Sequence, residues 1–220
     1  MLFSKKYRIL VLSFIRGDHL FYNFVMYILK FIVLLLNGRT TVYGKENLPD
    51  DEKFVLVAPH RSFLDPVFIA ISAYPHHFSF MAKEELFKIP VLGWIIRKIN
   101  AFPVNRDKPG VSAIKKPVNY LKNNELNVLI FPTGSRHSAE LKGGAVTIAR
   151  LGKSKIVPAV YSGPLTMKNV LLRKKAIVQF GEPFEVKRKI EGIEDVNEYY
   201  ANKIQESFDA IEESIENTSK

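Results

Sequence analysis

The chain has 220 residues, 47% of them hydrophobic and 25% charged, which excludes a disordered or collagen-like protein and leaves room for one domain with a sizeable core. Cysteine is absent, which excludes disulfide scaffolds, Cys-ligated zinc, iron–sulfur clusters and thiol nucleophiles. The net charge is +10, and because residues 191–220 carry −7, residues 1–190 carry +17. Such a basic balance favours partners that bear phosphate, namely a membrane, a nucleic acid or a small phosphorylated molecule.

The first 38 residues are typical of a helical segment at a membrane. Residues 9–15 form a short apolar run without a small-residue cleavage site, so we do not expect a secretory signal peptide. Residues 20–36 form an apolar run of 17 residues that contains Asn23 and Lys30. As a helix it would extend about 25 Å, less than the roughly 30 Å hydrocarbon core. We therefore expect a helix that enters one leaflet or lies at its surface; the alternative is a buried helix of a soluble core.

Beyond this segment, short apolar strands alternate with helical patterns. The expected strands cover residues 53–59, 78–82, 101–104, 127–131, 156–160 and 176–180, and the expected helices cover residues 65–73, 83–99, 111–122 and 143–151. Apolar residues that recur every three or four positions from Val196 to Ile215 predict a last helix with one buried face. The alternation predicts an α/β fold with a central mixed sheet flanked by helices. We expect two parts, a membrane-associated helical segment over residues 1–38 and a folded domain over residues 39–220.

A histidine and an aspartate follow the first predicted strand. His60 comes directly after it, and Asp65, followed by Pro66, is expected to cap the next helix. An extended chain would separate the two residues by about 17 Å, but a tight loop can bring the carboxylate to one imidazole nitrogen. The other nitrogen is then free to act as a base. The spacing alone favours the alternative, a capping Asp65 beside an exposed His60.

Two later loops carry cations directly after predicted strands. Arg106 follows one short strand, and Gly134, Ser135 and Arg136 follow a stronger one. An arginine can bind a phosphate through two parallel hydrogen bonds, and a glycine lets the backbone approach a ligand closely. The alternatives are a solvated surface arginine in the first loop and an ordinary strand-terminating turn in the second.

Taken in order, these motifs resemble those of the glycerolipid acyltransferase family, most closely the 1-acyl-glycerol-3-phosphate acyltransferases. The four matching blocks are His60 to Asp65 with its His-x4-Asp spacing, Phe102 to Arg106, Phe131 to Arg136, and Ile156 to Ala159. The resemblance covers about residues 40–185. This chain departs from the family in the third block, where Thr133 stands in place of the usual glutamate. Acceptor binding therefore cannot use a carboxylate at that position.

The resemblance implies transfer of a fatty acyl group from a thioester donor to the free 2-hydroxyl of 1-acyl-glycerol-3-phosphate, which makes phosphatidic acid. His60 is implied to be the general base and Asp65 to orient and stabilise its imidazole. The implied phosphate-binding residues are Arg106, Gly134, Ser135 and Arg136. The candidates for an acyl groove, each with plain core packing as the alternative, are Phe63, Leu86, Phe87 and Trp94.

The family also implies the partners. The acceptor is lysophosphatidic acid, and the co-substrate is the thioester of coenzyme A or of acyl-carrier protein. We expect no cofactor, no metal and no nucleic-acid partner. We expect peripheral or monotopic attachment to the anionic surface of the cell membrane, with the active site facing the cytoplasm.

Other functions have less support from the residues. The chain lacks the Gly-x-Ser-x-Gly motif of many serine hydrolases and the His-Glu-x-x-His motif of zinc proteases. Gly152, Lys153 and Ser154 lack the earlier glycine of a phosphate-binding loop. Within the family, a glycerol-3-phosphate acyltransferase or another lysophospholipid acyltransferase is the alternative. The non-enzymatic alternative is a basic protein that binds membranes or nucleic acid through charge alone.

Overall fold

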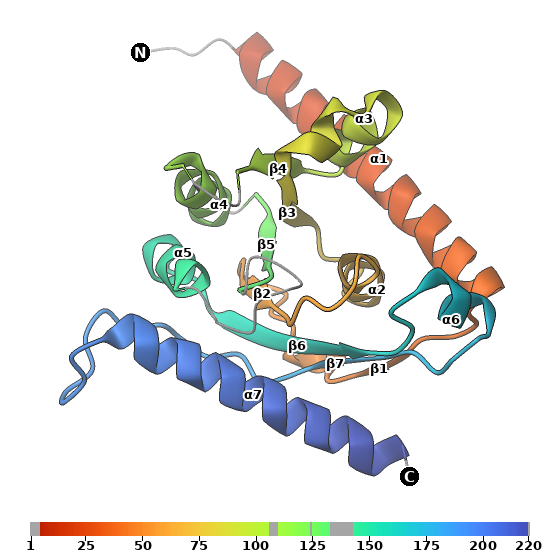
Figure 1. The fold of residues 1–220 in the computed structure, drawn as a ribbon. Helices are drawn as coiled ribbons and strands as arrows, with labels where there is room; N and C mark the ends of the chain where they lie inside the picture. Colours follow the sequence, from red (N-terminus) through yellow and green to blue (C-terminus); the bar gives the residue numbers. More distant parts are fainter. Residues whose placement is uncertain (1–4, 106–109, 124, 133–142, 220) are drawn as a thin grey trace.

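The structure, a computed structural model, describes residues 5–105, 110–123, 125–132 and 143–219. Strands of this part of the chain form a mixed sheet in the order β1-β7-β6-β2-β5-β3-β4 (Figure 1). Their bounds are β1 Thr41–Tyr43, β2 Val55–Val57, β3 Phe78–Lys83, β4 Ala101–Val104, β5 Asn127–Ile130, β6 Ile156–Ser162 and β7 Ile177–Phe180. Neighbouring strands are parallel except for β6 and β7, which pair antiparallel. The predicted central mixed sheet is therefore confirmed.

Helices cover both faces of this sheet. Their bounds are α1 Lys5–Leu36, η1 Lys45–Asn47, α2 Asp65–Ser72, η2 Glu84–Lys88, α3 Pro90–Lys98, α4 Ser112–Lys122, α5 Gly144–Gly152, α6 Met167–Leu171 and α7 Val196–Ser219, where η marks a 3-10 helix. The helices α4, α5 and α7 pack on one face, and α2 packs on the other with α1 outside it (Figure 1). The sheet is thus buried on both sides, as parallel strands require.

The strands divide their side chains between two cores. In β2, Val55 and Val57 belong to the core under α5 and α7, whereas Leu56 belongs to the core under α2. The pairing of β2 with β5 keeps this alternation in register, because Val55 lies opposite Val128 and Leu56 opposite Leu129. Alternate residues of a strand point to opposite faces, which is why these strands are apolar throughout.

Most predicted elements are present, with three differences. The stretch 83–99 is not one broken helix: β3 extends to Lys83, η2 follows, and α3 begins at Pro90, where the missing N–H of proline is harmless. The short elements β1 and α6 were not predicted. Asp65 was predicted to cap α2, and this is wrong, because the helix begins at Asp65 itself and no side chain caps it.

The N-terminal helix is a single helix of 32 residues, longer than either of the two apolar runs within it. Tyr22 and Met26 are buried against α2, while most of the remaining apolar side chains from residue 19 onward are exposed. The window His19–Leu36 has a mean hydropathy of 1.9 and is only 17% buried, so its length and composition would allow it to cross a membrane. This is consistent with membrane association.

Candidate active site

His60 lies at the carboxyl end of β2, beside the carboxyl end of β5. Parallel strands bring their carboxyl ends to the same edge of a sheet, which is where α/β proteins commonly bind ligands. Here the edge places the Phe131 ring 4.3 Å from the His60 ring, centroid to centroid, with 31° between the ring planes. The side chain of His60 is only 9% exposed. It is therefore held against an apolar neighbour, and the alternative of an exposed loop histidine does not describe it.

One carboxylate oxygen organises the loop that contains His60. Asp65 Oδ2 lies 3.2 Å from His60 Nδ1 and accepts the backbone N–H groups of Arg61 at 2.6 Å and Ser62 at 2.7 Å. The Asp65 side chain is 2% exposed, so the two backbone donors replace the water that a carboxylate would otherwise require. When His60 Nδ1 donates to this oxygen, Nε2 carries the lone pair and can accept a proton. The structure thus brings His60 and Asp65 together in the geometry of a base and its orienting partner.

Two more side chains hold the same loop to distant parts of the chain. Ser62 Oγ donates to the carbonyl of Leu165 at 2.7 Å. Arg61 Nη2 donates to the carbonyl of Tyr161 and pairs with Glu212 of α7, each at 3.1 Å. These contacts were not predicted, because nothing in the local sequence shows which distant segment an arginine or a serine will meet.

Tyr161 lies beneath this loop as a neutral hydrogen-bond donor. Burial and the nearby charge of Asp65 raise the pKa of the Tyr161 phenol well above its usual value. The phenol donates to the carbonyl of Pro164 at 2.9 Å, and its ring stacks on Phe68 of α2. Tyr161 therefore joins the floor of the loop to the segment that follows β6.

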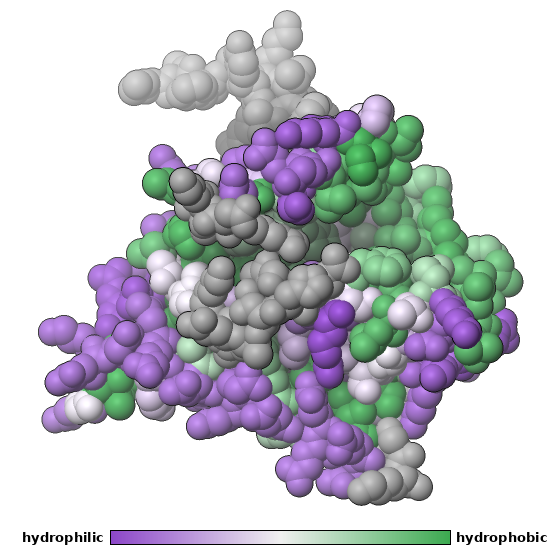
Figure 2. All heavy atoms as spheres, in the orientation of Figure 1, coloured by the Kyte–Doolittle hydropathy of each residue, from purple (hydrophilic) through white to green (hydrophobic). Residues whose placement is uncertain are grey.

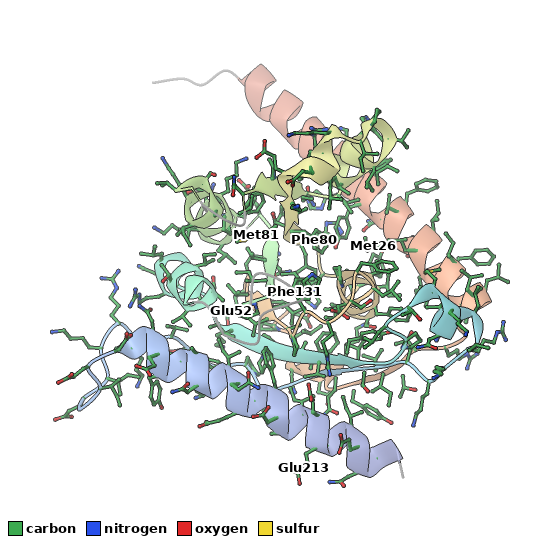
Figure 3. All side chains as sticks on the ribbon, viewed as in Figure 1. Met26, Glu52, Phe80, Met81, Phe131 and Glu213 are labelled. Atoms are coloured by element: carbon green, nitrogen blue, oxygen red, sulfur yellow. The ribbon has the colours of Figure 1, made fainter. Side chains whose placement is uncertain are left out.

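An apolar cavity of about 370 Å³ lies beside Phe131, whose ring contacts that of His60. It is lined by strand residues and by the facing sides of α4 and α5, including Met81, Val104, Ile114, Leu129, Phe131 and Ile148. Figure 3 labels Met81 and Phe131 near the centre of the molecule. Because Phe131 both lines the cavity and contacts the His60 ring, an apolar group in the cavity would extend to the neighbourhood of the imidazole.

The other predicted site residues lie in different surroundings. Phe63, Leu86 and Trp94 are exposed, and Phe87 is buried with the Arg97 guanidinium 5.1 Å from its ring centroid. None of these four lines the apolar cavity. The predicted phosphate-binding residues all lie outside the described residues; they are Arg106, Gly134, Ser135 and Arg136. Thr133, which stands in place of the usual glutamate, also lies outside them. In the described ranges, no three histidine, aspartate or glutamate side chains cluster as metal ligands.

Residues 39–162 match the family model described as Acyltransferase. The chain is 41% identical over 204 residues to the 1-acyl-sn-glycerol-3-phosphate acyltransferase of Streptococcus pneumoniae, covering 90% of this chain and 76% of that protein. It is 43% identical over 164 residues to the enzyme of the same name from Bacillus subtilis, covering 74% of this chain and 81% of that protein.

A solved structure has the same fold. The 1-acyl-sn-glycerophosphate (LPA) acyltransferase PlsC from Thermotoga maritima superposes with a TM-score of 0.64 at 23% sequence identity, covering 86% of this chain and 79% of that one. The match supports the α/β architecture described above.

Proposed function

This chain belongs to the acyltransferase family, and on that premise we propose that it acylates the free 2-hydroxyl of 1-acyl-glycerol-3-phosphate and so makes phosphatidic acid. The observation that carries the proposal is the imidazole of His60, held by the buried Asp65 carboxylate beside an apolar cavity. A base near an apolar space suits the transfer of a fatty acyl group to a hydroxyl. The names of the similar enzymes support lysophosphatidate as the acceptor.

In the proposed reaction, His60 Nε2 takes the proton of the acceptor hydroxyl as its oxygen attacks the carbonyl carbon of the thioester. Asp65 stabilises the imidazolium that forms, and the two backbone N–H groups hold the carboxylate in place. The tetrahedral intermediate then collapses, the carbon–sulfur bond breaks, and the thiolate takes the proton from the imidazolium. The step needs no covalent acyl-enzyme and no cofactor; the thioester of coenzyme A or acyl-carrier protein is the co-substrate.

We assign the cavity beneath Phe131 to the acyl chain of the donor. Burial of each methylene contributes about 0.8 kcal/mol, so an apolar cavity selects for a hydrocarbon chain. Phe63 is exposed in the same loop as His60, and we propose that it contacts the acyl chain of the acceptor. Arg106 and Arg136, with Gly134 and Ser135, are proposed from their motifs alone to bind the acceptor phosphate.

We also propose that the acceptor is reached from a membrane. The segment over residues 1–38 supplies an apolar helix whose outer side is exposed from residue 19 onward, and residues 39–220 are basic overall. Apolar side chains beside cations favour attachment to an anionic lipid surface, either peripheral or monotopic. The active site would face the cytoplasm, which supplies the thioester donors.

The test is labelled acyl transfer by the purified protein in detergent, with two acceptors and two donors. Lysophosphatidate and glycerol 3-phosphate are compared, each with acyl-coenzyme A and acyl-carrier protein. We expect transfer to lysophosphatidate at a rate well above that to glycerol 3-phosphate. Faster acylation of glycerol 3-phosphate would replace the proposed acceptor, and no transfer in any combination would overturn the proposed reaction.

A further inference from the structure

We propose that residues 163–175, which connect β6 to β7, form a second membrane-binding element that contacts anionic lipid headgroups. This segment is hereafter called the β6–β7 connection. The proposal rests on the proposed function only in taking a membrane as the partner, and it concerns a segment of the chain other than α1. Four observations support it.

The composition of the β6–β7 connection combines cations with exposed apolar side chains. It contains four basic residues and no acidic residue, and all four bases are exposed; they are Lys168, Arg173, Lys174 and Lys175. The exposed apolar residues are Leu165, Met167, Leu171 and Leu172, the last two 62% and 61% exposed. Exposed leucines at this density are unusual on a surface that faces only water.

The fold holds this segment in one orientation. Val170 is buried in the core under α2, and the Thr166 hydroxyl caps α6 by accepting the N–H of Asn169 at 3.3 Å. Met167 and Leu171, four residues apart, lie on one side of the helical turn, and both are exposed although Val170 anchors the same helix in the core.

The connection continues the exposed apolar surface of α1. Arg173 Nη2 donates to the carbonyl of Leu35 at 2.7 Å, and Asn37 Nδ2 donates to the carbonyl of Lys174 at 3.2 Å. These bonds fix α6 beside the carboxyl-terminal end of α1 (Figure 1). Figure 2 shows the hydrophobic surface of α1 and α3 ending among hydrophilic residues on the α6 side. Phe31 and Leu34, both exposed on α1, lie close to the end where the cations of the connection begin.

This pattern fits an anionic bilayer better than an acidic protein. Lysines and arginines attract anionic headgroups, while leucines beside them enter the boundary between headgroups and acyl chains. An acidic protein would satisfy the four cations but would leave the adjoining apolar side of α1 without a partner. The occupant we propose is therefore a lipid surface that contains anionic headgroups.

The connection is also bonded to the loop that carries the base. The carbonyl of Leu165 accepts the Ser62 hydroxyl at 2.7 Å, and the carbonyl of Pro164 accepts the Tyr161 phenol at 2.9 Å. Contact of the connection with headgroups would therefore hold the His60 loop at a fixed depth beside the bilayer. An acceptor could then reach the base without leaving the lipid.

The first experiment compares the vesicle binding of two variants. One loses three cations of the connection, and the other loses three cations elsewhere on the surface. The variant is Lys168→Ala, Lys174→Ala and Lys175→Ala, with Arg173 kept because it binds α1. The control is Lys187→Ala, Arg188→Ala and Lys189→Ala, three exposed bases just before α7 on the far side of the sheet. Both lose three charges. Binding is measured by co-sedimentation with vesicles of phosphatidylcholine, with or without phosphatidylglycerol.

We expect the variant to bind the vesicles that contain phosphatidylglycerol more weakly by about fivefold per cation, on the order of 100-fold in all. The control should lose much less, and binding to pure phosphatidylcholine should change little in either protein. Equal losses in variant and control would show an effect of net charge and would overturn the proposal, as would unchanged binding in the variant.

A second pair of measurements separates this proposal from the proposed function. Leu171→Ser with Leu172→Ser should weaken binding to both kinds of vesicle while the circular dichroism melting curve stays near that of the parent. Acyl transfer to an acceptor in vesicles should fall with binding, and transfer to a short-chain acceptor dissolved in water should not. Because co-sedimentation needs no turnover, an inactive enzyme would still show the binding result. Binding of the lysine variant to acyl-carrier protein is measured as well. If this variant no longer binds acyl-carrier protein but still binds vesicles as the parent does, the assignment of the connection to lipid would be overturned.

Discussion

Asp65 Oδ2 has three donors within hydrogen-bond distance, so its role in the site is inseparable from its role in the loop. Two donors are backbone N–H groups, which fix the loop, and the third is the imidazole of His60. A substitution at Asp65 therefore affects catalysis and stability to different extents, according to which of these bonds it preserves.

Asp65→Asn should leave an oxygen for the backbone donors but remove the charge that stabilises the imidazolium. We expect kcat to fall by about 10² to 10⁴ with little change in the melting temperature. Asp65→Ala should also leave two buried N–H groups unpaired, at a cost of about 1–3 kcal/mol each in the free energy of unfolding. His60→Ala serves as the comparison, since it should lose the activity and keep the stability. Near-normal turnover of His60→Ala would contradict the assigned base.

His77 lies between the domain and the N-terminal helix. Its ring centroid is 4.5 Å from those of both His19 and Tyr22, and its Nε2 lies 2.7 Å from Asn23 Oδ1. Burial and, to a lesser extent, the nearby charges of His19 and Lys53 together lower the pKa of His77 from 6.5 to about 4. The folded protein therefore favours the neutral imidazole.

The lowered pKa of His77 makes the free energy of unfolding depend on pH. Between pH 6.5 and pH 4 the unfolded chain binds a proton at His77 that the folded protein does not, so its contribution is complete above pH 6.5 and is lost as the pH falls towards 4. His77→Gln, which can still donate to Asn23, should flatten the fall in melting temperature over this range. An unchanged slope in the variant would show that other groups produce the pH dependence.

At the scale of elements, the pattern of apolar residues predicts the strands and helices that have a continuous apolar run or a regular apolar stripe. The strands β2, β5 and β6 and the helix α7 were predicted because each has a run or stripe of buried apolar residues. The three residues of β1 lie between Thr40 and Gly44 and not inside an apolar run, and the five residues of α6 are too few to show a period. The His60 and Asp65 pair was predictable from its motif, whereas the bond from Ser62 to Leu165 joins residues 103 positions apart and leaves no local signal. The cavity was missed for the same reason, since several separate elements line it.

The contribution of α7 to the core can be measured at Phe208. Phe208 is fully buried with Tyr200 and Ile204 against the sheet, so Phe208→Ala should lower the free energy of unfolding by about 3–5 kcal/mol. Glu213→Ala is the control on the same helix, exposed and labelled in Figure 3, and should change it by less than about 0.5 kcal/mol. Urea denaturation measures both. Similar small effects would mean that α7 contributes little to the core.

At the scale of the whole molecule, the outer side of α1 is exposed, whereas its inner side packs on the rest of the protein. Phe24 and Phe31 are exposed, whereas Tyr22 and Met26 pack on α2. Removing the helix would expose α2, so substitutions on the outer side give a cleaner test of membrane attachment than a deletion does.

Phe24→Gln with Phe31→Gln should weaken binding to vesicles by about tenfold or more per residue, because burying a phenylalanine contributes about 1.5–3 kcal/mol. The control is Leu151→Gln with Tyr199→Gln, two exposed apolar residues on α5 and α7. Co-sedimentation reports binding, and a melting curve confirms the fold. Equal binding by the parent and the α1 variant would place the attachment elsewhere.

The position of α7 has a consequence for how the protein meets a bilayer. This helix and the turn before it carry the −7 of residues 191–220, and they lie across the sheet from α1 and α6 (Figure 1). The molecule is therefore an electric dipole whose negative pole is repelled by anionic lipid. A protein that arrives with α7 foremost experiences a torque that rotates it before contact, over the roughly 10 Å reach of charge at 0.1 M salt. Added salt should therefore slow productive encounters even where the final attachment is mainly apolar.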